Sequence, residues 1–215
     1  MPDAGDGEIK LTLLQEETLK EMANVGAARA TDTLAKLTNI SLEIKVPYIQ
    51  LLHLEGVFGG LVAPREMLVS LPLNVFGKDR AIICVICKRK AAMHLVDLLF
   101  GKQLGHTLKM EEREISAFLE ISNIILNSYI TEMSEFFKTE FAPSAPRIVL
   151  EPESLQEEFR ETVDEKTAFA LVLGTRFRVM HSETIAAQFT LIVGLKTLDK
   201  LKKAIDGKVK EQVIF

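Results

Sequence analysis

The chain has 215 residues, of which 47% are hydrophobic, so it is long enough to bury a core as one large domain or two small ones. Its 26 basic and 30 acidic residues include no basic stripe interleaved with aromatic residues, so nucleic acid is not an expected partner. No window approaches eighteen consecutive apolar residues, and the N-terminus is acidic, so we expect neither a membrane span nor a signal peptide, and a cytoplasmic location.

The elements of the first half follow from the hydrophobic pattern. Residues 1–10 are expected to form a flexible leader, and Leu11 to about Leu37 is predicted to be one long helix. From Ile40 to Lys88, short apolar runs separated by turn signals predict several antiparallel strands. One of these signals, at 56–60, is interpreted as a hairpin turn and not a phosphate-binding loop, because no Lys-Ser/Thr follows it. Lys90 to Gly101 predicts a shorter helix that ends at glycine.

Both cysteines, Cys84 and Cys87, lie in a run of β-branched and apolar residues that is typical of a buried strand. Alternation along a strand would point the two thiols to opposite faces of the sheet. A structural zinc site would need two more ligands, and the four histidines are not spaced as ligands. We therefore interpret the cysteines as buried apolar side chains and expect no metal site.

The second half repeats this order of elements. The sequence predicts a long helix from about Glu111 to Lys138, strands at Arg147 to Leu150 and from Ala168 to Leu195, and a last helix from about Thr197 to Ile205 with Gly207 just beyond it. Three residues of the first half, Glu21, Asn24 and Pro47, recur at one constant offset as Glu120, Asn123 and Pro146. Two repeats of this kind are expected to pack around a pseudo-two-fold axis and share one sheet.

The predicted fold is therefore α+β and internally duplicated, with an antiparallel sheet and two long helices that present the candidate sites. We predict a single domain at 11–215, made of two repeats at about 11–101 and 111–207.

Polar residues recur along one stripe of each long helix. On the first helix Glu17, Glu21 and Asn24 share a narrow stripe, whereas apolar residues that include Leu19 and Leu37 cluster on the opposite side. The second helix has an equivalent stripe: Ser116, Glu120, Asn123 and Asn127. Asparagine in mid-helix is slightly unfavourable, so two such placements at equivalent points indicate a function.

Either helix alone would be interpreted as ordinary solvated surface. An exposed asparagine in a helix is replaced by alanine at little cost, so we expect Asn24→Ala and Asn123→Ala to leave the fold unchanged. The two prolines, each after a long helix and at the entry to a strand, are interpreted as structural.

The duplicated pattern resembles the signature of CheC-type chemotaxis phosphatases, a family related to CheX and FliY. That signature is Asp or Ser, three residues, Glu, two residues, Asn, then 22 residues and Pro. The second copy fits completely, at Ser116, Glu120, Asn123 and Pro146. The first copy has Glu17 where Asp or Ser is expected, so the second site is the more secure expectation.

This resemblance implies a phosphatase, a hydrolase that removes the aspartyl phosphate of a phosphorylated CheY-like response regulator in two-component signalling. Asn24 and Asn123 would orient the attacking water, while Glu21 and Glu120 would pair with the regulator's active-site lysine. Ser116 would support Glu120. The chain would need no cofactor of its own, because the regulator would supply Mg²⁺.

Two alternatives remain open from the sequence. The chain could be a non-catalytic adaptor that binds the phosphorylated regulator or a CheD-type receptor deamidase. A flagellar-switch component like FliY is disfavoured, because no additional C-terminal switch domain is expected. A catalyst would accelerate dephosphorylation at substoichiometric amounts, whereas an adaptor would only bind.

Overall fold

The computed structural model describes residues 10–53, 66–77, 79–149, 168–179 and 184–213. The predicted leader, except Lys10, and the predicted turn at 56–60 lie outside these residues. The described elements, in chain order, are α1 (Leu13–Thr38), β1 (Leu42–His53), β2 (Glu66–Val75), β3 (Asp79–Lys88), α3 (Arg89–Leu99), α4 (Glu112–Phe137), β4 (Phe141–Pro143), β5 (Arg147–Val149), β6 (Ala168–Val179), β7 (Thr184–Gly194) and α6 (Leu195–Val213).

The described strands form one antiparallel sheet in the order β1-β6-β7-β3-β2-β4, with β5 also paired to β2. This order reads the same from both edges when β1 is matched with β4 and β5, β2 with β6, and β3 with β7. The predicted α+β fold with an internal pseudo-two-fold duplication is thereby confirmed. The repeat boundaries at 11–101 and 111–207 stay a prediction.

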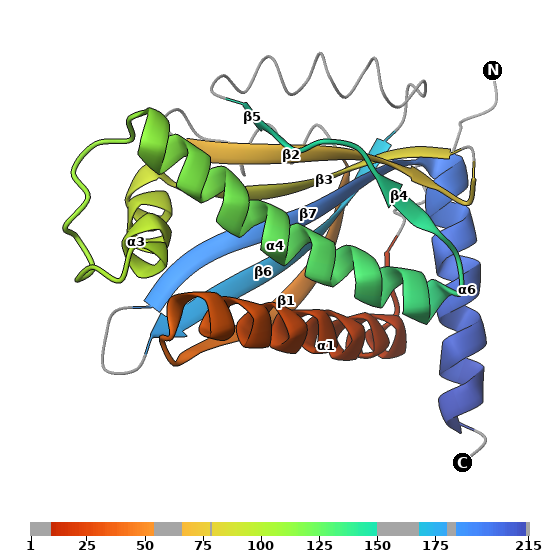
Figure 1. The fold of residues 1–215 in the computed structure, drawn as a ribbon. Helices are drawn as coiled ribbons and strands as arrows, with labels where there is room; N and C mark the ends of the chain where they lie inside the picture. The colour runs from red at the N-terminus through yellow and green to blue at the C-terminus, as the bar shows by residue number, and fades with distance from the viewer. Residues whose placement is uncertain (1–9, 54–65, 78, 150–167, 180–183, 214–215) are drawn as a thin grey trace.

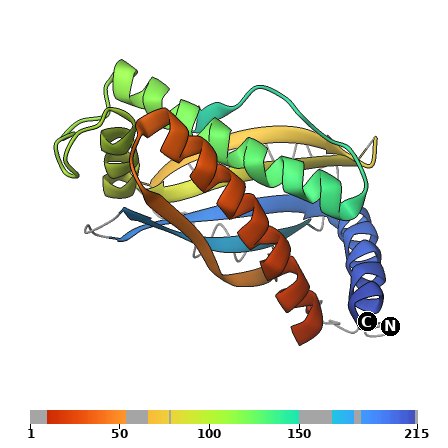
Figure 2. The same cartoon turned by 60° about the horizontal axis from the view of Figure 1, so that its bottom comes forward.

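Helices α1 and α4 lie side by side over one face of the sheet and run in opposite directions (Figures 1 and 2). α3 and α6 lie at opposite ends of the sheet (Figure 1). The main core fills the space between these helices and the sheet, and its largest fully buried side chains include Phe118, Tyr129 and Phe189. A smaller buried cluster, with Ile82, Val172 and others, lies on the opposite face of the sheet.

The two cysteines are buried, as predicted, and are not joined in a disulfide. Cys87 belongs to the main core and Cys84 to the smaller cluster on the opposite face, so strand alternation separates them.

Local capping fixes the ends of α1. Thr12 accepts a hydrogen bond from the Gln15 backbone N–H at 3.2 Å, and the Gln15 side chain accepts one from the Thr12 N–H at 2.9 Å, which is a capping box. Asn39 ends the helix with a left-handed backbone, φ 54°, and donates its N–H to the Ala35 carbonyl.

Three details of the predicted elements are wrong. α6 continues through Gly207 to Val213, because one glycine lowers the stability of a lysine-rich helix by only about 1 kcal/mol. β4 was not predicted, because its three residues include Pro143, and a proline within a short run counts against a strand. Leu37, predicted on the apolar side of the first helix, is 59% exposed, because it lies in the last turn of α1. Among the helices described, none is long and apolar enough to cross a membrane.

Candidate functional site

Asn24 is partly buried, and both ends of its carboxamide are used within the chain. Its Oδ1 accepts a hydrogen bond from the Val46 backbone N–H at 3.0 Å, and its Nδ2 donates to the Lys20 carbonyl at 2.9 Å. Val46 immediately precedes Pro47 in β1. The side chain therefore ties α1 to β1, and it is not displayed as the free amide that the sequence suggested.

The surroundings of the first Glu/Asn pair are basic. Glu17 and Glu21 are exposed on α1. Asn24 lines a groove of about 560 Å³, and four basic residues line it as well: Lys20, Lys45, Arg176 and Arg178. The acidic side chain in this groove, Glu43, is paired with Lys45 at 2.8 Å, and this hydrogen bond lowers the pKa of Glu43.

The second pair, on α4, is more open. Asn123 Oδ1 accepts a hydrogen bond from Asn127 Nδ2 at 2.7 Å, and the same Nδ2 lies 2.8 Å from the Asn123 carbonyl. Within the described part of the chain, Asn123 Nδ2 has no hydrogen-bond partner, and the exposed Glu120 has neither a hydrogen bond nor an ion pair. The second site thus keeps a carboxylate and an amide N–H available to a partner.

Asn123 faces an open groove of about 550 Å³ between α4 and the C-terminal half of α1. Arg29 crosses from α1 to α4, where its Nε lies 3.2 Å from Glu132 Oε2 and its Nη1 lies 3.1 Å from Glu135 Oε1. Burial raises the pKa of Glu132 more than the neighbouring Arg29 lowers it. These ion pairs hold the helices together beside Asn123.

The three residues expected to support the pairs are Ser116, Pro47 and Pro146, and of these Pro47 lines the groove of Asn24. Ser116 donates its hydroxyl to the Glu112 carbonyl at 2.9 Å, and no hydrogen bond joins it to Glu120. Pro47 lies at an irregularity in the pairing of β1 with β6, and Pro146 lies immediately before β5. Both prolines therefore lie where a strand begins or is irregular, as expected for structural residues.

The structure does not bring the two Glu/Asn pairs together. Because α1 and α4 run in opposite directions, the N-terminal half of each helix lies beside the C-terminal half of the other (Figures 1 and 2). Each pair would therefore meet a separate partner molecule. Over the described ranges there is no group of three His, Cys, Asp or Glu side chains that could hold a metal ion.

Asn127 lies on the predicted polar stripe of the second long helix, but the sequence pattern indicated no role for it. The structure identifies it as the side chain that orients the Asn123 carboxamide. The available signal was the spacing of four residues, which brings two side chains together on one helix face.

No family model matches the chain. The CheY-P phosphatase CheC of Bacillus subtilis (strain 168) is 25% identical over 211 residues, which are 91% of this chain and 95% of that relative. Over nearly its whole length the chain is therefore similar to a CheC-type protein.

Two solved structures share the fold of this chain. FliY of Thermotoga maritima superimposes with a TM-score of 0.73 at 18% identity, covering 93% of this chain and all of that one. A chain of the FliG-FliM complex from H. pylori has a TM-score of 0.63 at 10% identity, covering 86% and 95%. At these identities the structural likeness concerns the fold alone.

Proposed function

We propose that this chain hydrolyses the aspartyl phosphate of a phosphorylated CheY-like response regulator, mainly through Glu120 and Asn123. The observation that carries the proposal is the open second pair: an unpartnered carboxylate one turn from a carboxamide that Asn127 orients. The relative named as a CheY-P phosphatase, which matches over 91% of this chain, supports the same reaction.

Hydrolysis of the aspartyl phosphate requires mainly that a water molecule is positioned in line with phosphorus. Water attacks phosphorus, the bond from phosphorus to the aspartyl oxygen breaks, and inorganic phosphate and a free aspartate result. Positioning and electrostatic stabilisation supply most of the rate in such transfers. The Mg²⁺ bound by the regulator would neutralise charge on the phosphoryl oxygens.

Asn123 is suited to hold the attacking water. An amide oxygen has two lone pairs, of which Asn127 uses one, so the other can accept a hydrogen bond from water. Glu120, one turn earlier, would form a charge-assisted bond with the regulator's lysine and set the register of docking. Asn127 acts as a positioning residue, because its contact is with Asn123 and not with the reacting atoms.

The first pair has the weaker claim. Asn24 would have to release Val46 before its Oδ1 could serve a water, and the loss of a buried hydrogen bond typically costs about 1 kcal/mol or more. We therefore propose that Glu21 and Asn24 contribute less to the reaction than Glu120 and Asn123.

The test is phosphate release from a phosphorylated CheY-like regulator with substoichiometric amounts of the chain. Asn123→Ala should lower the stimulated rate by about 10²-fold, comparable to the loss of one aligned hydrogen bond in other transition states. The matched control is Asn74→Ala, which removes an exposed asparagine on β2, and it should keep the wild-type rate. Full stimulation by Asn123→Ala would overturn the proposed role.

A second candidate function is that of a non-catalytic adaptor for the phosphorylated regulator or for a CheD-type deamidase. One observation favours it: the carboxamide of Asn24 is engaged within the chain, so the first pair does not offer a free amide for catalysis. In the same assay an adaptor would bind the regulator without accelerating phosphate release. Capture of a purified CheD-type deamidase would test the other proposed partner.

A further inference from the structure

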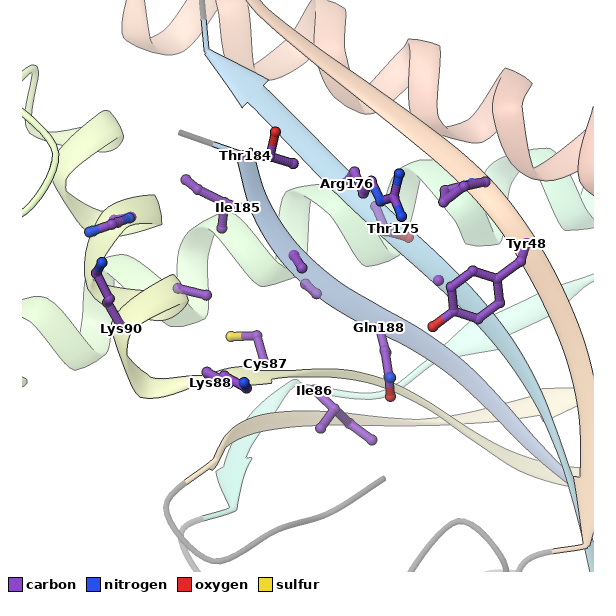
Figure 3. Close-up of a pocket in the computed structure, with 16 residues that line it drawn as sticks. Tyr48, Ile86, Cys87, Lys88, Lys90, Thr175, Arg176, Thr184, Ile185 and Gln188 are labelled. Atoms are coloured by element: carbon purple, nitrogen blue, oxygen red, sulfur yellow. The ribbon is translucent and has the colours of Figure 1, made fainter. Parts of the chain in front are cut away.

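A cavity of about 450 Å³ lies where β3 ends and α3 begins (Figure 3), and neither Glu120 nor Asn123 lines it. β3 pairs with β7 only as far as Cys87 and Ala187, so the first residues of β7 have no β3 neighbour. The cavity occupies this notch and also reaches β1 and β6. Its size is that of small-molecule sites in proteins.

The cavity is lined by cations. Arg176 on β6 pairs with Ala186 on β7. On the other side of Ala186, Lys88 comes directly after Cys87, the last β3 residue that pairs with β7. The two basic residues therefore flank the small Ala186. Their backbones are two strand spacings apart, about 10 Å, which leaves room for a ligand between the two heads. Lys90 adds a third cation, and no acidic residue is among the described residues that line the cavity.

The start of α3 faces the same space. Its N-cap, Lys88, makes no side-chain capping bond, and its first turn contains no acidic residue. The first N–H groups of a helix have no partner within the helix and carry partial positive charge, which favours an anion. Lys90 and Ala91 from this turn line the cavity.

An independent observation comes from buried polar groups. His94 lines the cavity and is only 6% exposed, and within the described part of the chain it forms no hydrogen bond or ion pair. Gln188 Oε1, on β7, is likewise buried without a partner. Buried polar atoms are nearly always satisfied, so these two side chains are available to hydrogen-bond a ligand that enters the cavity.

One wall of the cavity is flat. Tyr48, Gly174 and Gln188 form a cross-strand row on one face of the sheet, and Tyr48 and Gln188 are labelled in Figure 3. The ring of Tyr48 lies directly over Gly174, where a Cβ atom would approach ring carbons to 2.1 Å. This wall can take the planar part of a ligand while the cations hold its charged end.

We propose that this cavity binds a small molecule that carries a phosphate group. Lys88, Arg176 and the first N–H groups of α3 would hold the phosphate, and His94 and Gln188 would hydrogen-bond the ligand. The site does not use Glu120 or Asn123, so it is independent of the second Glu/Asn pair, while Arg176 also lines the groove of Asn24.

The experiment titrates the chain with inorganic phosphate, adenosine monophosphate and adenosine, followed by NMR shifts of the Lys90 and Ala91 amides and the His94 ring. Phosphate or adenosine monophosphate should produce saturable shifts at these positions. Tighter binding of the nucleotide identifies a phosphate ester as the ligand, and equal binding identifies free phosphate; either result supports the site. Absence of saturable shifts up to millimolar concentrations, or adenosine binding as tightly as its monophosphate, would overturn the proposal.

Paired variants locate the site. Lys88→Gln with Arg176→Gln should weaken phosphate-dependent binding roughly tenfold or more, since each removes a charge-assisted bond but keeps a polar side chain. Lys196→Gln with Lys203→Gln removes the same charge from exposed positions on α6 and should leave binding unchanged. Equal losses in both double variants would mean non-specific charge attraction and no site at the notch.

Discussion

Asn24 and Asn123 occupy equivalent positions of the duplicated sequence but form different bonds. The carboxamide of Asn24 forms hydrogen bonds with the backbone of α1 and β1, whereas that of Asn123 accepts a hydrogen bond from the neighbouring Asn127 side chain. The same residue type thus connects a helix to a strand in one repeat and lines an open groove in the other.

This difference corrects the expectation that both asparagines can be replaced without effect on the fold. Asn24→Ala leaves the Val46 N–H without its partner, so it should lower the free energy of unfolding by about 1 kcal/mol. For a chain of this size that corresponds to a Tm lower by about 2–4 °C. Asn123→Ala removes only a surface contact and should change stability much less. Urea unfolding of both variants is the measurement, and equal midpoints would contradict the assigned role of Asn24.

The sequence could show that Asn24 lies on a polar stripe, but not that its amide reaches β1. That contact depends on the distance between two packed elements. The spacing of Asn24 from Pro47 contained a hint, because the residue before the proline is the one whose N–H donates to Asn24. The equivalent bond is absent beside Asn123, which instead has Asn127 within reach.

At the scale of elements, α1 and α4 approach closely at one glycine. A Cβ atom on Gly26 would lie 3.0 Å from Tyr129 Cδ1 and 3.4 Å from Tyr129 Cα. Tyr129 is 1% exposed and packs against Phe189, with ring centroids 4.8 Å apart, so it cannot move aside freely. The contact between the two site-bearing helices therefore requires glycine at this position.

Gly26→Ala should destabilise the protein by about 1–3 kcal/mol, because overpacking outweighs the helix preference of alanine. The matched control is Gly207→Ala in α6, where nothing lies within 4 Å of the added Cβ. There the same change should stabilise by about 0.5–1 kcal/mol. Thermal unfolding of both variants decides the matter, and a stabilised Gly26→Ala would show that the helices can separate without penalty.

Periodicity predicted the long helices and most of the strands, because each has enough residues to show its repeat. It failed for β4, whose three residues form a strand only because β2 offers an open edge. It also placed the end of α6 too early, since a glycine often ends a helix but does not have to. Strand order and pairing depend on long-range contacts and were not predicted; the duplication indicated only that the two repeats share one sheet.

At the scale of the whole molecule, the two predicted repeats exchange their edge strands. β1 comes from the first repeat but pairs only with β6 of the second, while β4 and β5 of the second pair with β2 of the first. The central pair, β3 with β7, joins the two halves along most of its length. Neither repeat keeps a complete sheet without the other.

We therefore predict that the chain unfolds as one cooperative unit and that residues 11–101 alone do not fold. The isolated first repeat would expose β1 without β6 and the apolar face of α1 without α4, so its buried area would be too small to offset chain entropy. Urea unfolding followed by circular dichroism and by native-state hydrogen exchange should give one free energy for β1, β3 and β7. Two separate transitions, or a folded 11–101 fragment with dispersed NMR signals, would show that each repeat is an independent domain.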